Sequence, residues 1–170
     1  MLRPLAFALL AGAAAATAQD LNPQIDYAGF QQLTNEVSAY REARLLTWQE
    51  FEAAARDPGT LVLDARSADA YAAGHIRGAV NLPFTDFTAE SLAQVIGRRD
   101  RQLLIYCNNN FRNAAPPVPM KRAELALNIQ TFINLVGYGY TNVRELGEVV
   151  DFDDPKVGWV KGRSPAGDAV

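Results

Sequence analysis

The chain contains a single cysteine, Cys107, in a setting that favours anion chemistry. It directly follows the apolar run Leu103–Tyr106, which is typical of a buried parallel strand. Three asparagines come next, and Asn tolerates the tight-turn conformations in which successive backbone N–H groups converge on an anion. Arg112, five positions after the cysteine, adds a guanidinium near the same loop. We therefore predict a nucleophilic thiol whose pKa is lowered by these donors, although position alone fits a buried core cysteine equally well.

A second set of polar residues follows another apolar run, residues 61–63. Asp64 and Arg66 come at the end of this run, and His75, the only histidine, lies between a turn signal and the next short strand. An aspartate at a strand end more often fixes a loop through backbone N–H groups than acts as a base. We predict that all three residues support the site structurally. A Cys–His–Asp triad stays open, but the spacing gives no support for it.

The elements that must position these residues alternate between short apolar strands and helical segments. Thr47 with Glu50 fits a capping box, and Thr88 before Glu90 fits a second helix start. We predict strands at 45–46, 61–63, 79–82, 103–106 and 143–146, and helices at 47–56, 68–73, 88–96 and 121–136. This order indicates an α/β fold with a central parallel sheet and helices on both faces. Sites in such sheets form beyond the carboxyl ends of the strands, where Cys107 lies.

The two ends of the chain differ from its middle. Residues 1–18 have a positive start at Arg3, an apolar Ala-rich stretch and small residues before Gln19, as in a secretory signal peptide. The alternative is a buried N-terminal helix. We interpret 19–44 as an N-terminal extension with a short amphipathic helix, 45–152 as the domain and 153–170 as an irregular tail. The protein is then periplasmic or secreted, where an unpaired thiol requires a functional explanation.

Composition excludes several other classes of protein. A chain of 170 residues, 49% hydrophobic and 21% charged, suits one globular domain. A formal charge of −3 argues against nucleic acid as the main partner. One cysteine and one histidine exclude an internal disulfide and argue against a zinc cage, and no glycine-rich nucleotide motif occurs. No apolar run is long enough to span a membrane. We therefore expect no metal and no organic cofactor.

Four segments, in this order, resemble the rhodanese (sulfurtransferase) domain family. They are Leu61–Arg66, Tyr71–Pro83, Leu104–Cys107 and Gly137–Leu146. The resemblance extends over roughly residues 45–150 and implies a rhodanese-like fold. It also implies that Cys107 takes a sulfur atom from a small anionic donor such as thiosulfate. The cysteine would hold the sulfur as a persulfide and pass it to cyanide, or to a small-molecule or protein thiol.

The resemblance further implies roles for individual residues. The loop after Cys107 would form the substrate cradle, with Asn108, Asn109, Asn110, Phe111, Arg112 and Asn113 as its members. Asp64, Arg66 and His75 fall on family positions that are mainly structural. Residues 114–120 carry three prolines and form an insertion before the next helix, which is a candidate contact surface for a protein partner.

Two alternatives remain open at this point. A phosphatase or arsenate reductase on the same fold would need a wider loop, with arginine one position further from the cysteine than Arg112. The observed spacing therefore favours sulfur over phosphate. A non-catalytic sulfur carrier or docking module would keep the fold and use the insertion at 114–120 as its contact site, because fold alone does not establish function.

Overall fold

A computed structural model describes residues 22–112 and 118–162 of the chain. The chain divides into two units, residues 1–32 and 33–170. In the first unit, the described residues form a turn and the beginning of helix α2 (Tyr27–Glu42). The expected signal segment, 1–18, lies outside the described residues. None of the helices in the described ranges is long and apolar enough to cross a membrane.

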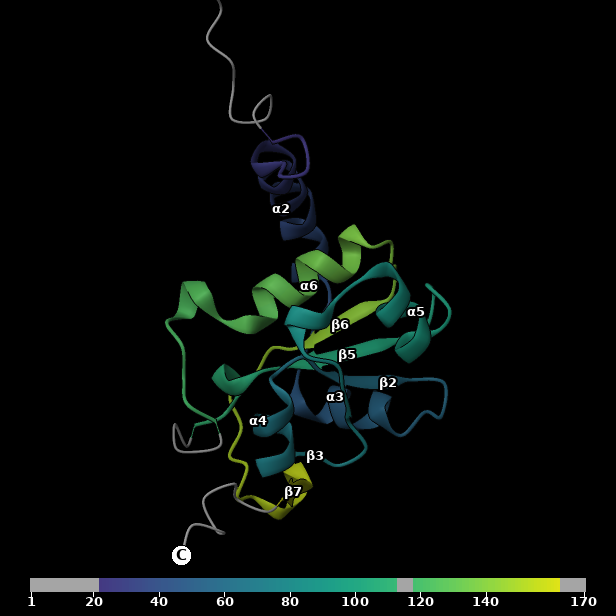
Figure 1. The fold of residues 1–170 in the computed structure, drawn as a ribbon. Coiled ribbons are helices and arrows are strands. Elements are labelled where there is room, and N and C mark those ends of the chain that lie inside the picture. Colours follow the sequence, from purple (N-terminus) through teal and green to yellow (C-terminus); the bar gives the residue numbers. More distant parts are fainter. Residues whose placement is uncertain (1–21, 113–117, 163–170) are drawn as a thin grey trace, which may run out of the picture. The chain divides into compact units, whose positions relative to one another are not determined.

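The second unit is built around a parallel sheet, as the sequence predicted (Figure 1). Its strands are β1 (Leu45–Leu46), β2 (Leu61–Asp64), β4 (Val80–Asn81), β5 (Leu103–Tyr106) and β6 (Val143–Leu146). The five strands lie in the order β1-β6-β5-β2-β4, and every neighbouring pair is parallel. The two strands that lead into the polar site residues, β2 and β5, are therefore neighbours. Asp64 lies opposite Tyr106 at their carboxyl ends.

Helices cover both faces of this sheet. They are α3 (Trp48–Ala55), α4 (Ala68–Ala73), α5 (Ala89–Ile96) and α6 (Leu127–Gly137). Leu103 and Ile105 of β5 pack into one apolar core together with residues of α5 and α6. Leu104 packs into the opposite core with Phe51 of α3, because successive strand residues point to opposite faces. In Figure 1, α6 lies above the sheet and α4 below it. A strand buried on both faces explains the uninterrupted apolar run before Cys107.

Local sequence signals set two of the helix starts. The Thr47 hydroxyl accepts the N–H of Glu50, and the Glu50 carboxylate accepts the N–H of Thr47 at 2.9 Å, which confirms the predicted capping box. Thr88 caps α5 in the same manner. Gly97 ends that helix with φ of 80°, a conformation that favours glycine.

The helix predicted at 121–136 begins later than expected. A short 3-10 turn, Ala123–Leu125, comes first, and α6 begins at Leu127. The backbone of Lys121 is not free to start a helix, because its N–H and C=O both bind the side-chain amide of Asn109, at 3.1 and 2.7 Å. A contact with the loop after Cys107 therefore delays the helix.

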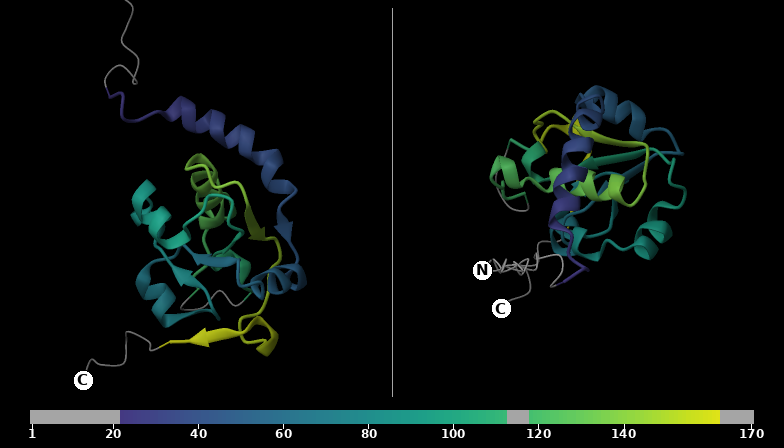
Figure 2. Two further views of the ribbon diagram at one scale, coloured as in Figure 1. Left: turned by 90° about the vertical axis from the view of Figure 1, so that its right-hand side faces the viewer. Right: turned by 90° about the horizontal axis from the view of Figure 1, so that it is seen from above.

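A second, two-stranded sheet corrects the expectation for the C-terminal residues. Strand β3 (Gly74–Ile76) pairs antiparallel with β7 (Trp159–Lys161), which Figure 2 shows in yellow, apart from the five-stranded sheet. Residues 159–161 were expected to be irregular. Three residues are too few for an alternating pattern to be recognised, and they adopt strand conformation because a partner far away in the sequence pairs with them. Residues 163–170 lie outside the described ranges.

Candidate functional site

Cys107 directly follows β5, and its side chain lies where backbone N–H groups converge. The thiol accepts hydrogen bonds from the N–H groups of Asn109, Leu127 and Asn128. Leu127 and Asn128 are the first two residues of α6, so the positive end of that helix faces the sulfur. The N–H nest predicted from the asparagines is thus formed by one loop residue and the start of a helix.

Burial controls the ionisation of this thiol. Cys107 is only 2% exposed, and burial raises its pKa above the ordinary range of a cysteine. The N–H groups of Asn128 and Asn109 lower the pKa in part, whereas the buried carboxylate of Glu145 raises it further. The prediction of a lowered thiol pKa is therefore wrong, because loss of hydration outweighs the neutral donors. At neutral pH the described site holds the protonated thiol.

The side chain of Asn110 fixes the loop after Cys107. It is 8% exposed, and its oxygen accepts the N–H of Cys107 at 2.9 Å. Its amide nitrogen donates to the backbone oxygens of Leu146 and Glu148, at 2.8 and 3.1 Å. These bonds join the loop to the end of β6, so this asparagine holds the backbone in place and its side-chain groups are already used.

The other two asparagines hold the segment that precedes α6. Asn108 donates to the backbone oxygen of Pro119 at 3.1 Å, and Asn109 binds both backbone groups of Lys121. Val118 is fully buried in the core beside this segment. The described end of the proline-containing insertion is thus attached to the loop after Cys107. Residues 113–117, which include Asn113 of the expected cradle, lie outside the described ranges.

Phe111 and Arg112 lie outside the pocket that contains Cys107. Phe111 is fully buried, and its ring packs edge-on against Tyr106 with centroids 5.9 Å apart. Arg112 is exposed, and its N–H donates to the backbone oxygen of Val150 at 2.8 Å. A pairing of Phe111 with Val150 places both residues beside the chain that leaves β6. Neither residue is among those that line the pocket described below.

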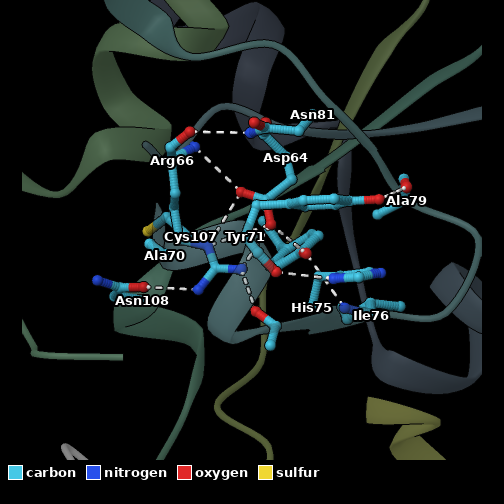
Figure 3. Close-up of polar contacts among 12 residues, drawn as sticks. Asp64, Arg66, Ala70, Tyr71, His75, Ile76, Ala79, Asn81, Cys107 and Asn108 are labelled. Carbon is cyan, nitrogen blue, oxygen red and sulfur yellow. Dashed lines mark hydrogen bonds and ion pairs between the residues drawn. The ribbon is translucent and has the colours of Figure 1, made fainter. Parts of the chain in front are cut away.

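Asp64 and Arg66 form a buried ion pair at the end of β2 (Figure 3). The Arg66 guanidinium donates to both Asp64 carboxylate oxygens, at 2.6 Å for Nη2 and 2.9 Å for Nε, and to the backbone oxygen of Gly74 at 2.7 Å. The Tyr106 hydroxyl donates to Asp64 Oδ2 at 2.5 Å. Burial opposes the charge on Arg66, but its bonds to Asp64 and the charge of Asp64 raise its pKa overall. Arg66 also reaches Asn108 at 3.3 Å, which links the pair to the loop after Cys107.

His75 lies in β3 and is not among the residues that line the pocket. Its Nδ1 is 2.8 Å from the backbone oxygen of Tyr71, and the two rings stack with centroids 3.8 Å apart. The Tyr71 hydroxyl in turn donates to the backbone oxygen of Ala79 at 2.7 Å. These contacts tie α4 to the turn before β4. The structure brings Asp64 and Arg66 towards Cys107 but leaves His75 outside the described pocket lining.

A pocket of about 1150 Å³ opens beside Cys107. It lies beyond the carboxyl ends of β2, β4 and β5, as expected for a parallel sheet. Besides Cys107, its lining includes Arg66, Lys121, Leu127, Phe152 and Trp159. No group of three or more His, Cys, Asp or Glu side chains suited to a metal occurs in the described part of the chain. The pocket thus offers a thiol, converging N–H groups and nearby cations.

Sequence reasoning did not identify several residues around this site. Asn128 donates its side-chain amide to Asn110 at 3.0 Å and to Glu145 at 3.1 Å. Glu145 also binds Arg41, which is partly exposed, so a chain of polar contacts extends from α2 to the loop after Cys107. Trp159 lies in the strand that was not predicted. A polar residue within the apolar stretch of α6 or β6 was the only available signal for Asn128 and Glu145, and it does not say what either residue contacts.

The family model described as the rhodanese-like domain matches residues 47–147, which is more than half of the chain. No curated protein gives a significant sequence match.

Solved structures with a similar fold include two of the Alr3790 protein from Anabaena sp. Its rhodanese-like domain, solved by solution NMR, is 17% identical over 75% of this chain and 85% of that chain, with a TM-score of 0.48. The crystal structure is 18% identical over 69% of this chain and 80% of that chain, also with a TM-score of 0.48. Wild-type EanB is 21% identical over 60% of this chain, with a TM-score of 0.44, and the match spans only 23% of the EanB chain.

Proposed function

The chain belongs to the rhodanese-like domain family, and on this premise we propose that it is a sulfurtransferase with Cys107 as its nucleophile. One observation carries the proposal. The only cysteine in the chain follows the central strand and receives N–H groups from Asn109 and from the first turn of α6. Such donors stabilise a thiolate or a persulfide anion as negative charge develops on sulfur.

The proposed reaction has two displacement steps. Cys107 loses its proton to solvent, and the thiolate attacks the outer sulfur of a thiosulfate-type donor. A new S–S bond forms while the S–S bond of the donor breaks, and sulfite leaves with the bonding electron pair. A nucleophilic acceptor then attacks the outer sulfur of the persulfide and restores the Cys107 thiolate. Cyanide leaves as thiocyanate and a thiol leaves as its persulfide, so neither an oxidant nor a reductant is consumed.

Three cations, Lys121, Lys161 and Arg66, line the pocket that an anionic donor would enter. Lys121 is exposed and lines the pocket, and Arg66 lines it from the buried side. Arg66 is neutralised by Asp64, and Lys161 lies 3.2 Å from Asp153, which leaves Lys121 as the cation better able to attract a donor from solvent. In our proposal this lysine takes the part that sequence reasoning assigned to Arg112.

We also propose that the protein is exported, so that it acts in the periplasm or outside the cell. The pattern of residues 1–18 supports this proposal, since it combines a basic start, an apolar stretch and a small-residue cleavage site. The acceptor in such a compartment is a small molecule or a protein thiol.

Intact mass spectrometry tests the sulfur transfer. The mature protein and its Cys107→Ser variant are incubated with thiosulfate, and each mass is measured before and after addition of cyanide. We expect the wild type to gain the mass of one sulfur atom and to lose it again to cyanide. The Cys107→Ser variant should gain no sulfur. Sulfur transfer that continues unchanged in Cys107→Ser with several donors would contradict the proposal.

A second candidate is a docking or sulfur-carrier module without catalytic turnover. The observation in its favour is the nearly complete burial of Cys107, which keeps the thiol protonated. In this case a persulfide would form only from a partner protein and not from thiosulfate. Deletion of residues 115–119 tests this candidate: a full-length protein that takes up no sulfur from thiosulfate, and whose deletion variant loses its protein partner, would indicate docking.

A further inference from the structure

Two aromatic residues beyond the matched family residues form one wall of the pocket. Phe152 and Trp159 both line the pocket that contains Cys107, and both come after residue 147, where the family match ends. We call this pair the aromatic wall. Trp159 and Lys161 of β7 both line the pocket, whereas Val160 between them does not, as expected for alternating side chains in a strand. Both members of the wall thus lie outside the matched residues 47–147.

The aromatic wall is held firmly by its neighbours. The Trp159 ring packs edge-on against Phe111 with centroids 4.9 Å apart, and it stacks with Phe152 at 5.3 Å. The Arg66 guanidinium lies 5.4 Å from the centroid of the same indole. At Gly74, an added Cβ would lie only 2.5 Å from Trp159 Nε1, so the indole lies flat against β3. The wall therefore presents a preformed apolar surface in the pocket that contains the thiol.

The size of the pocket exceeds what the smallest substrates require. Pockets for drug-sized ligands measure about 300 to 1000 Å³, and this one measures about 1150 Å³. Thiosulfate and cyanide have only a few atoms each and would fill a small part of it. Phe84 and Leu127 also line the pocket and add to its apolar surface. An occupant with an apolar organic body would use surface that an inorganic anion leaves uncovered.

The net charge of the pocket lining does not determine which molecule binds there. The charged side chains in the lining are of both signs, and one cation is already paired, since Lys161 lies 3.2 Å from Asp153. The exposed acidic members of the lining are Asp69, Asp86 and Asp153. Exposed pairs contribute little to binding, so apolar contact is the stronger determinant of recognition here.

We propose that the aromatic wall selects a sulfur acceptor that is an organic thiol with an aromatic-sized apolar body. The body packs on Phe152 and Trp159 while the thiol reaches the outer sulfur of the Cys107 persulfide. The acceptor thiolate forms a bond to that sulfur, the Cys107–sulfur bond breaks, and the product is an organic persulfide. This inference rests on the proposed sulfur transfer and names the class of its acceptor.

Competition between acceptors tests the selection. The rate of sulfur loss from the Cys107 persulfide is measured with benzyl mercaptan, with 2-mercaptoethanol as a small thiol, and with cyanide. We expect Trp159→Ala to reduce transfer to benzyl mercaptan about tenfold more than transfer to either small acceptor. Trp159→Phe should restore most of the difference. Val160→Ala, in the same strand but outside the lining, serves as the matched control. Equal changes for all three acceptors in Trp159→Ala would overturn the inference.

A binding measurement keeps this result separate from the sulfur transfer itself. In the Cys107→Ser background, which has no thiol, calorimetry measures the affinity for benzyl mercaptan with and without Trp159→Ala. One outcome is that Trp159→Ala weakens the binding of benzyl mercaptan while the wild-type protein takes up no sulfur. This outcome would support the aromatic wall and contradict the sulfurtransferase proposal. The opposite result, sulfur transfer without any effect of Trp159→Ala on benzyl mercaptan, would contradict the wall alone. Phe84→Ala, on another element, provides a second test if Trp159→Ala does not fold.

Discussion

The buried carboxylate of Glu145 opposes the ionisation of Cys107. Glu145 lies on β6, next to the strand that leads to the cysteine, and its charge raises the pKa of the thiol. The Arg41 guanidinium binds this carboxylate through two bonds of 2.6 Å, and Asn128 binds it at 3.1 Å. Arg41 comes before the matched family residues, so a residue of the N-terminal segment compensates the charge beneath the site.

Glu145→Gln should lower the pKa of Cys107, because it removes the negative charge and keeps an oxygen that can accept from Asn128. The rate of alkylation by iodoacetamide, measured from neutral to alkaline pH, gives this pKa directly, since the thiolate is the reactive form. The midpoint should move to lower pH. Glu52→Gln, on the exposed surface of α3, is the matched control. A midpoint that stays in place or rises in a folded Glu145→Gln protein would contradict this role.

The raised thiol pKa also makes stability depend on pH. The folded state disfavours the thiolate. The contribution of the protonated Cys107 thiol to the free energy of unfolding is therefore fully present below the ordinary thiol pKa of about 8.5. It is lost as pH rises from there through the higher pKa of the folded protein. The difference in unfolding free energy between wild type and Cys107→Ser, measured by urea denaturation, should therefore fall over this alkaline range. A difference that grows with pH would show that the folded state stabilises the thiolate.

Arg66→Leu should destabilise the fold strongly. The change leaves the Asp64 carboxylate buried without its partner, which costs about 3–5 kcal/mol in comparable pairs. Thermal and urea unfolding measure the loss. Arg98→Leu provides the matched control, because its pair with Asp100 is exposed and should change little. Similar stabilities for the two variants would mean that the buried pair does not stabilise the end of β2.

Lys121→Gln should weaken the use of thiosulfate more than Arg112→Gln. Lys121 lines the pocket beside Cys107, whereas Arg112 is exposed and lies outside the described lining. Loss of one exposed cation should raise KM for thiosulfate by a few fold, and added salt should reduce the difference. Steady-state kinetics at low and high salt measure both effects. A larger effect of Arg112→Gln would return the anion-binding role to the loop arginine.

Expression of the full chain in a bacterium tests the proposed export. We expect the periplasmic fraction to contain a protein that begins at Gln19 and has the corresponding mass, because signal peptidase cuts after a small-residue site such as Ala16–Ala18. Intact mass and N-terminal sequencing identify the first residue. Replacement of Ala16 and Ala18 with bulky residues should prevent cleavage. A protein that keeps Met1 to Ala18 in the cytoplasm would contradict export.

Several features of this protein follow from its sequence alone, because short-range physics determines them. The capping pair Thr47–Glu50 and the end of α5 at Gly97 need only neighbouring residues. The apolar runs before Asp64 and Cys107 predict buried parallel strands, and their carboxyl ends meet because parallel strands share that edge. The family resemblance, confirmed over residues 47–147, also rests on local motifs.

Other features depend on the tertiary structure, because they arise between residues that are far apart in the chain. β7 becomes a strand only because β3 pairs with it, and its Trp159 reaches the pocket only through that pairing. The first turn of α6 meets the Cys107 sulfur after an intervening insertion whose length does not predict the contact. The direction of the thiol pKa also reverses, because burial and Glu145 act through space and outweigh the donors that the local loop pattern indicated.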